Sequence, residues 1–234
     1  MRVRAVGWWF VGLLLAALLA AFLLMPREPQ VQRFENLPWQ IEVLGAGRTQ
    51  VLGIVLGETT LADLAGRLPV PDIRLFVEPD GTRSVEAYFS NARIPPFEAN
   101  LVMVLGLDEP ALERIWEQRT SERPMPSGAR RYGLSDAALV ELGRVPVAEL
   151  SYIPRARWDG DLTRERFGDP VSRMRVDDDQ DYWLYPDSGL AIMVPARRGR
   201  MLMHYATLDR WERVLERLEQ AGQRRLDDAP ADAS

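Results

Sequence analysis

Cysteine is absent from this sequence of 234 residues, and His204 is its only histidine. The chain can therefore form no disulfide, no thiol nucleophile and no cysteine-rich zinc site, and it cannot be lipidated on an N-terminal cysteine. A single imidazole also excludes metal sites that need two or three histidine ligands. Lysine is absent too, and we attribute the exclusive use of arginine to codon usage in a GC-rich genome rather than to selection for carboxylate pairing.

An excess of basic charge is also lacking, because the formal net charge is −5. Surfaces that bind DNA or RNA need clustered basic side chains to neutralise phosphates. We therefore expect no nucleic-acid partner. The hydrophobic content of 47% is ordinary for a folded chain with a core.

Motifs that would indicate catalysis or ligand binding are missing as well. There is no Gly-x-Ser-x-Gly elbow and no glycine-rich phosphate loop. The acidic run 177–181 alternates aspartates like a calcium loop, but Tyr182 and Ser188 occupy the positions that need glycine and glutamate. His204 lies in a predicted strand and is interpreted as structural, although a Ser-His-Asp arrangement stays possible. We predict no catalytic residue, no metal and no cofactor.

One long apolar run is present near the N-terminus. Residues 5–25 carry no charge, and a helix of this length, at about 1.5 Å per residue, spans the roughly 30 Å core of a membrane. Arg2 and Arg4 precede the run and Pro26 follows it, which predicts an uncleaved transmembrane helix with residues 1–4 in the cytoplasm. A cleaved secretory signal is the alternative, but leucines occupy the −3 positions of the candidate cleavage sites.

Such a helix would anchor the chain in a bacterial inner membrane and place the rest of it in the periplasm. Gly12, Ala16 and Ala20 recur every four residues and form a stripe of small residues against which a second membrane helix could pack. Residues 26–38 are rich in proline and lack apolar periodicity, so we expect an extended tether.

The remainder shows short strands and short helices. Apolar and β-branched runs predict strands at 39–44, 49–57, 99–107, 147–153, 181–186, 190–195 and 200–206, and a hairpin of two strands at 73–91 around Pro79-Asp80-Gly81. Capped amphipathic patterns predict helices at 58–69, 109–119, 136–142, 162–167 and 208–220. The fold class is therefore predicted as α+β, an antiparallel sheet or sheets with short helices. Its two halves, 39–119 and 132–221, would be separated by a loop at 120–131 and followed by a disordered tail at 222–234.

Two segments share an order of features. Residues 57–71 and 160–171 each place a short capped helix before a proline stop and then enter a hairpin. This shared order predicts two tandem helix-hairpin units. The alternative is that the similarity of the two segments is a coincidence in an α+β chain.

The second unit carries a motif in which a threonine-bearing helix leads to a Gly-x-Pro stop and then to a strand with Trp-x-Tyr. The residues are Thr163, Phe167, Gly168, Asp169, Pro170, Trp183 and Tyr185. Over residues 158–205 the chain resembles the SmpA/OmlA family of outer-membrane assembly lipoproteins and, by fold, the tandem-repeat β-lactamase inhibitor proteins; it also looks like other proteins of proteobacterial envelopes. The resemblance implies helices layered on an antiparallel sheet that binds proteins. The lipidated cysteine of that family is absent here.

Three aromatic residues are candidates for partner binding. On the predicted strand Trp183 and Tyr185 share one face while Tyr182 takes the other. Trp and Tyr are favoured interface anchors, although each face could instead pack beneath a helix. We therefore expect a periplasmic binding or assembly module without catalytic activity that docks an envelope protein. The alternatives are an accessory subunit of a larger membrane complex, held through its transmembrane helix, and, with least support, an envelope enzyme.

Overall fold

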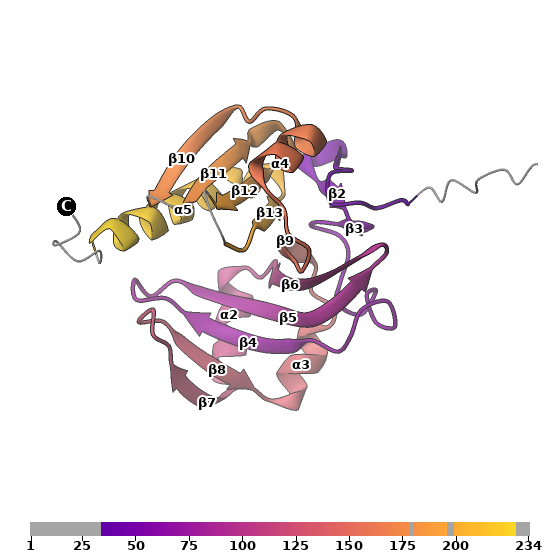
Figure 1. Ribbon diagram of the computed structural model, residues 1–234. Helices are drawn as coiled ribbons and strands as arrows, with labels where there is room; N and C mark the ends of the chain where they lie inside the picture. The colour runs from indigo at the N-terminus through magenta and orange to yellow at the C-terminus, as the bar shows by residue number, and fades with distance from the viewer. Residues whose placement is uncertain (1–33, 178–179, 196–198, 228–234) are drawn as a thin grey trace, which may run out of the picture. The chain divides into compact units, whose positions relative to one another are not determined.

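The structure is a computed structural model that describes residues 34–177, 180–195 and 199–227 (Figure 1). Its strands form two antiparallel sheets. The small sheet contains, in spatial order, β1 (Glu42–Val43), β2 (Thr49–Val51) and β3 (Ile54–Val55). A short 3₁₀ helix, η1 (Gly45–Gly47), connects β1 to β2.

The large sheet contains ten strands. They are β4 (Asp72–Val77), β5 (Arg83–Ile94), β6 (Phe97–Leu105), β7 (Arg119–Pro124), β8 (Arg130–Leu134), β9 (Val147–Pro154), β10 (Ser172–Asp177), β11 (Gln180–Tyr185), β12 (Leu190–Pro195) and β13 (Leu202–Ala206). Their order is β10-β11-β12-β13-β9-β6-β5-β4-β8-β7, and every neighbouring pair is antiparallel. Because β6 pairs with β9, one sheet runs through both halves of the chain.

Within the described residues, four α-helices accompany the sheets. They are α2 (Glu109–Glu117), α3 (Asp136–Leu142), α4 (Gly160–Phe167) and α5 (Trp211–Asp227). Side chains cap the first three as predicted, because Asp108, Ser135 and Asp159 each accept a hydrogen bond from the backbone N–H three residues later. Two further 3₁₀ helices, η2 (Pro186–Ser188) and η3 (Leu208–Arg210), precede β12 and α5.

The main core lies on one face of the large sheet. Leu75 of β4 and Leu101 of β6 belong to the same buried cluster as Ile115 of α2, Leu142 of α3 and Ile54 of the small sheet. Figure 1 shows α2 and α3 behind β4 to β8. We call this side of the sheet the covered face.

A second cluster lies on the opposite face. Trp211 and Val214 of α5 pack there against Leu184, Ala191 and Ala206 of β11 to β13. Removing these side chains from water is worth about 2 kcal/mol for each large one. Helix α5 therefore covers the second half of the sheet on this face, along β10 to β13 (Figure 1).

Residues 58–69 form turns instead of the predicted helix. Thr60 N donates to Asp63 Oδ2 at 2.9 Å, and Leu64 N donates to the carbonyl oxygen of Leu61. Gly66 has φ near 80°, a left-handed conformation that ends a helical run. The turns still bury Leu61 and Leu64, which is why the apolar spacing looked helical.

The predicted α+β fold with two tandem helix-hairpin units is wrong. The first unit lacks its helix, and the part of the chain that the structure describes is organised by one antiparallel sheet that continues through both halves. Strand β7 occupies part of the segment 120–131, where we expected a loop. All its residues are exposed at the edge of the sheet, so it shows no alternation of apolar and polar side chains.

The predicted membrane placement is also corrected. Among residues 34–177, 180–195 and 199–227, no helix is long and apolar enough to cross a membrane. The predicted transmembrane helix, residues 5–25, lies outside the described residues, as do Gly12, Ala16 and Ala20. The structure gives no support to the single-pass anchor, the membrane partner, the inner-membrane location or the periplasmic placement, and none of them enters the proposals below.

Candidate functional site

The face of the sheet that carries α5 is only partly covered. Beyond β13, the side chains that point to this face from four strands form what we call the open face. They are Asp72, Arg74, Phe76, Ser84, Glu86, Tyr88, Asn100, Val102, Val104, Ser151 and Ile153. The direct pairs Arg74–Glu86, Glu86–Val104 and Asn100–Ile153 place them on one side of the sheet.

The open face is apolar at its centre and incompletely buried. Tyr88 is 41% exposed, and Phe76, Val102, Val104 and Ile153 are half-buried and belong to neither core cluster. On the covered face of the same strands, in contrast, Leu75, Val85, Leu101 and Leu150 are fully buried. The sheet therefore presents a partly apolar surface to solvent over β4, β5, β6 and β9.

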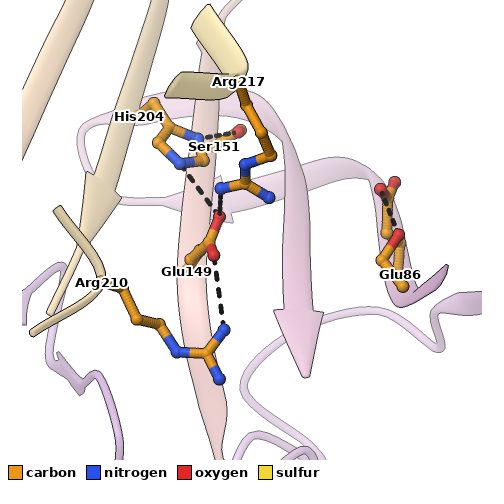
Figure 2. Close-up of polar contacts among 7 residues, drawn as sticks. Glu86, Glu149, Ser151, His204, Arg210 and Arg217 are labelled. Atoms are coloured by element: carbon orange, nitrogen blue, oxygen red, sulfur yellow. Dashed lines mark hydrogen bonds and ion pairs between the residues drawn. The ribbon is translucent and has the colours of Figure 1, made fainter. Parts of the chain in front are cut away.

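A polar cluster lies where the open face meets α5. Glu149 and Ser151 are two residues apart on β9, so they share a face, and His204 of β13 pairs directly with Ser151. His204 Nδ1 lies 2.8 Å from Ser151 Oγ, and His204 Nε2 lies 3.2 Å from Glu149 Oε2. Figure 2 shows His204 between these two side chains, with Arg217 and Arg210 approaching the carboxylate.

Two arginines complete the neutralisation of Glu149. Arg217 of α5 bonds to Oε2, and Arg210 Nη1 of η3 lies 3.5 Å from Oε1. The glutamate is only 3% exposed. Its burial would raise its pKa, but the contact and charge of His204 and the charge of Arg217 outweigh burial and lower the pKa to about 2. Glu149 is therefore ionised in the folded protein.

The order Ser151–His204–Glu149 resembles a hydrolase relay, but its surroundings favour a structural role. Both β9 and β13 are interior strands, so their backbone N–H groups bond to neighbouring strands and do not form an oxyanion hole beside Ser151. The carboxylate is held by two guanidinium groups from α5 and η3. We interpret the cluster as the polar connection that fixes α5 to the sheet.

Glu86 is a second acidic residue on the same side, on β5 at some distance from the cluster (Figure 2). Burial is the main cause that raises its pKa; the charges of Glu78 and Glu149 add to this, while Ser84 and Arg217 oppose it. Ser84 Oγ donates to Glu86 Oε1 at 3.4 Å.

A pocket of about 490 Å³ opens at one end of the open face. We call it the arginine pocket, because Arg155, Arg157 and Arg200 line it together with Asn91 and Asn100. No aspartate or glutamate is among the described residues of its wall. Three residues of the open face, Tyr88, Asn100 and Ile153, also line the pocket, so the two surfaces are continuous.

The predicted partner-binding aromatics lie elsewhere. Trp183 is 5% exposed, with the guanidinium groups of Arg164 and Arg173 over its ring at 5.4 and 4.4 Å. Tyr185 is buried on the same face, and its Oη donates to Gly168 O at 3.0 Å. Burial is the main cause that raises the Tyr185 pKa to about 12.

Tyr182 points to the opposite face, as predicted, and packs against the α5 cluster. The structure thus packs Trp183 and Tyr185 together and separates Tyr182 from them. Their role in partner binding stays a prediction.

Sequence reasoning missed Glu149 and the three arginines of the pocket. A signal existed for Glu149, because a charged residue within the strand pattern VAELSYI is unusual for an interior strand. No comparable signal marks Arg155, Arg157 and Arg200, since they come from two segments that only the fold brings together.

Comparison of the chain with models of protein families, with curated proteins and with solved structures finds no match. The resemblance of residues 158–205 to the SmpA/OmlA family therefore stays a prediction. The functional conclusions below rest on the geometry of the open face and the arginine pocket.

Proposed function

We propose that this chain is a non-catalytic binding module that docks an acidic segment of another protein on the open face. The observation that carries the proposal is the row of half-buried apolar side chains on β4 to β6 and β9, where Tyr88 is 41% exposed. Exposed apolar side chains interleaved with polar ones are typical of interaction sites. The predicted docking of a protein is retained, but it moves away from the buried Trp183 and Tyr185.

Charge favours an acidic partner over a second copy of the chain. The chain has a formal net charge of −5, yet the pocket at the end of the open face is lined by three arginines. On the open face itself the carboxylate of Asp72 is paired with Arg74 at 2.7 Å. Like charges across an interface are unfavourable, whereas an acidic segment would be complementary.

The test is site-specific photo-crosslinking in cells that express the full chain. A benzophenone amino acid replaces Tyr88 on the open face or, as a matched control, Val140, which is 67% exposed on α3 at the opposite side of the sheet. We expect position 88, and not position 140, to capture one protein. That protein is then purified and titrated against the full-length chain by calorimetry.

Substitutions then decide whether the open face is the docking surface. We expect Val102→Arg to weaken binding of the captured protein at least tenfold, because it places an unpaired charge within a desolvated interface. Val140→Arg should leave the affinity unchanged, and melting curves should show that both variants are folded. Capture of a second copy of the chain, equal capture at both positions, or unchanged affinity of Val102→Arg would each refute the proposal.

A further inference from the structure

The arginine pocket has the chemistry of a specific subsite. We propose that it binds a carboxylate of the docked segment, held between the side chains of Arg157 and Arg200. This inference rests on the proposed function, because the pocket is continuous with the open face through Tyr88, Asn100 and Ile153.

The pocket offers positive charge that the protein itself leaves unused. Arg155 bonds to Asn91 Oδ1 and is fixed in place. Arg157 and Arg200 are exposed, and neither has an ion-pair partner within the described residues. Planar guanidinium groups match a carboxylate by two parallel hydrogen bonds. An anionic ligand would therefore supply the partner that these two side chains lack.

The two amide side chains of the pocket also favour an anion. Asn91 Oδ1 accepts from Arg155, and Asn100 Oδ1 accepts from the backbone N–H of Asn91 at 3.0 Å. With both oxygens engaged as acceptors, each side chain has its NH₂ group left to donate. The NH₂ groups of Asn91 and Asn100 are thus available as donors, which suits an acceptor-only ligand such as an ionised carboxylate.

The apolar part of the pocket favours a carboxylate on an alkyl side chain over inorganic phosphate. Ile153, Trp158 and Met201 can accept the methylene groups of a glutamate side chain.

The experiment uses small probes with the full-length protein. N-acetylglutamate N-methylamide and its glutamine counterpart, which differ only in the carboxylate, are titrated while the NMR signals of the Trp158 indole N–H and of the arginine Nε–H groups are followed. We expect the glutamate compound to bind at least tenfold more tightly and to weaken as salt screens the charges. Inorganic phosphate is titrated in parallel.

Matched variants locate the site. Arg157→Gln and Arg200→Gln should each weaken binding of the glutamate compound about tenfold, as expected for loss of a charge-assisted hydrogen bond. Arg144→Gln removes the same charge from an exposed position after α3 and should change nothing. Equal binding of the two amides, or phosphate binding more tightly than the glutamate compound, would overturn the carboxylate assignment.

The two proposals can fail separately. If Val102→Arg abolishes docking of the crosslinked protein while Arg157→Gln and Arg200→Gln leave it unchanged, the pocket inference is refuted and the docking stands. If the glutamate compound binds as expected but no protein docks on the open face, the proposed function is refuted, and the carboxylate site is no longer part of a docking surface.

Discussion

Replacing Glu149 with glutamine tests whether the polar cluster fixes α5 to the sheet. The substitution keeps the size of the side chain and removes its charge, so it imitates a protonated glutamate. Arg210 and Arg217 then lose the carboxylate that neutralises them. Because the cluster is the connection between α5 and β9, we expect the free energy of unfolding to fall.

The magnitude follows from the pKa of Glu149, which is lowered from 4.5 to about 2 on folding. A carboxyl whose pKa is lower in the folded state stabilises the protein above its unfolded pKa and loses this effect as the pH falls through the folded value. The shift corresponds to about 3 kcal/mol at neutral pH, to about 1 kcal/mol near pH 3, and to almost nothing below pH 2. The difference in the free energy of unfolding between wild type and Glu149→Gln should decrease with falling pH in the same way.

The assay is urea denaturation of both proteins between pH 7 and pH 3. In thermal denaturation at neutral pH, the loss of about 3 kcal/mol should lower the melting temperature by about 6 to 12 °C for a domain of this size. Glu122→Gln is the control, because Glu122 forms an exposed pair with Arg130 at 3.1 Å and its removal should cost less than about 1 kcal/mol. A stability difference for Glu149→Gln that stays constant with pH would refute the reasoning.

Three further predictions concern the packing of Trp183, the cap of α4 and the turn at Gly189. Trp183→Ala should cost about 3 to 5 kcal/mol in urea denaturation, since Trp183 is a core residue; a loss below about 1 kcal/mol would instead favour its predicted role in partner binding. Asp159→Ala should cost about 1 kcal/mol by removing the cap of α4, and Asp159→Asn should restore most of it, whereas equal losses would contradict a capping role. Gly189→Ala should lower the melting temperature more than Gly66→Ala. Both glycines have positive φ, but a Cβ at Gly189 would overlap the carbonyl oxygen of Ala206, whereas the space at Gly66 is open. Equal falls in the melting temperature of the two variants would therefore rule out this overlap as the cause.

The local elements of this protein follow from its sequence because their causes are local. A capping side chain and an amphipathic run lie within a few residues of each other, as at Asp108 before α2 and Ser135 before α3. The same holds for the hairpin of β4 and β5, where alternation and a Pro-Asp-Gly turn are adjacent. Where a glycine with positive φ intervened, as at Gly66, the same apolar spacing produced turns.

Only the tertiary structure decided which segments share a surface. The pairing of β6 with β9 joins the two halves into one sheet, and no local pattern specifies it because any two apolar strands could pair. Trp183 is buried on the covered face beside α4, whereas Tyr88 lies on the open face and is 41% exposed. The tertiary structure also brings Glu149 beside His204 and Arg217, and Arg155 beside Arg200, because contacts between residues far apart in the chain depend on the register of the whole sheet.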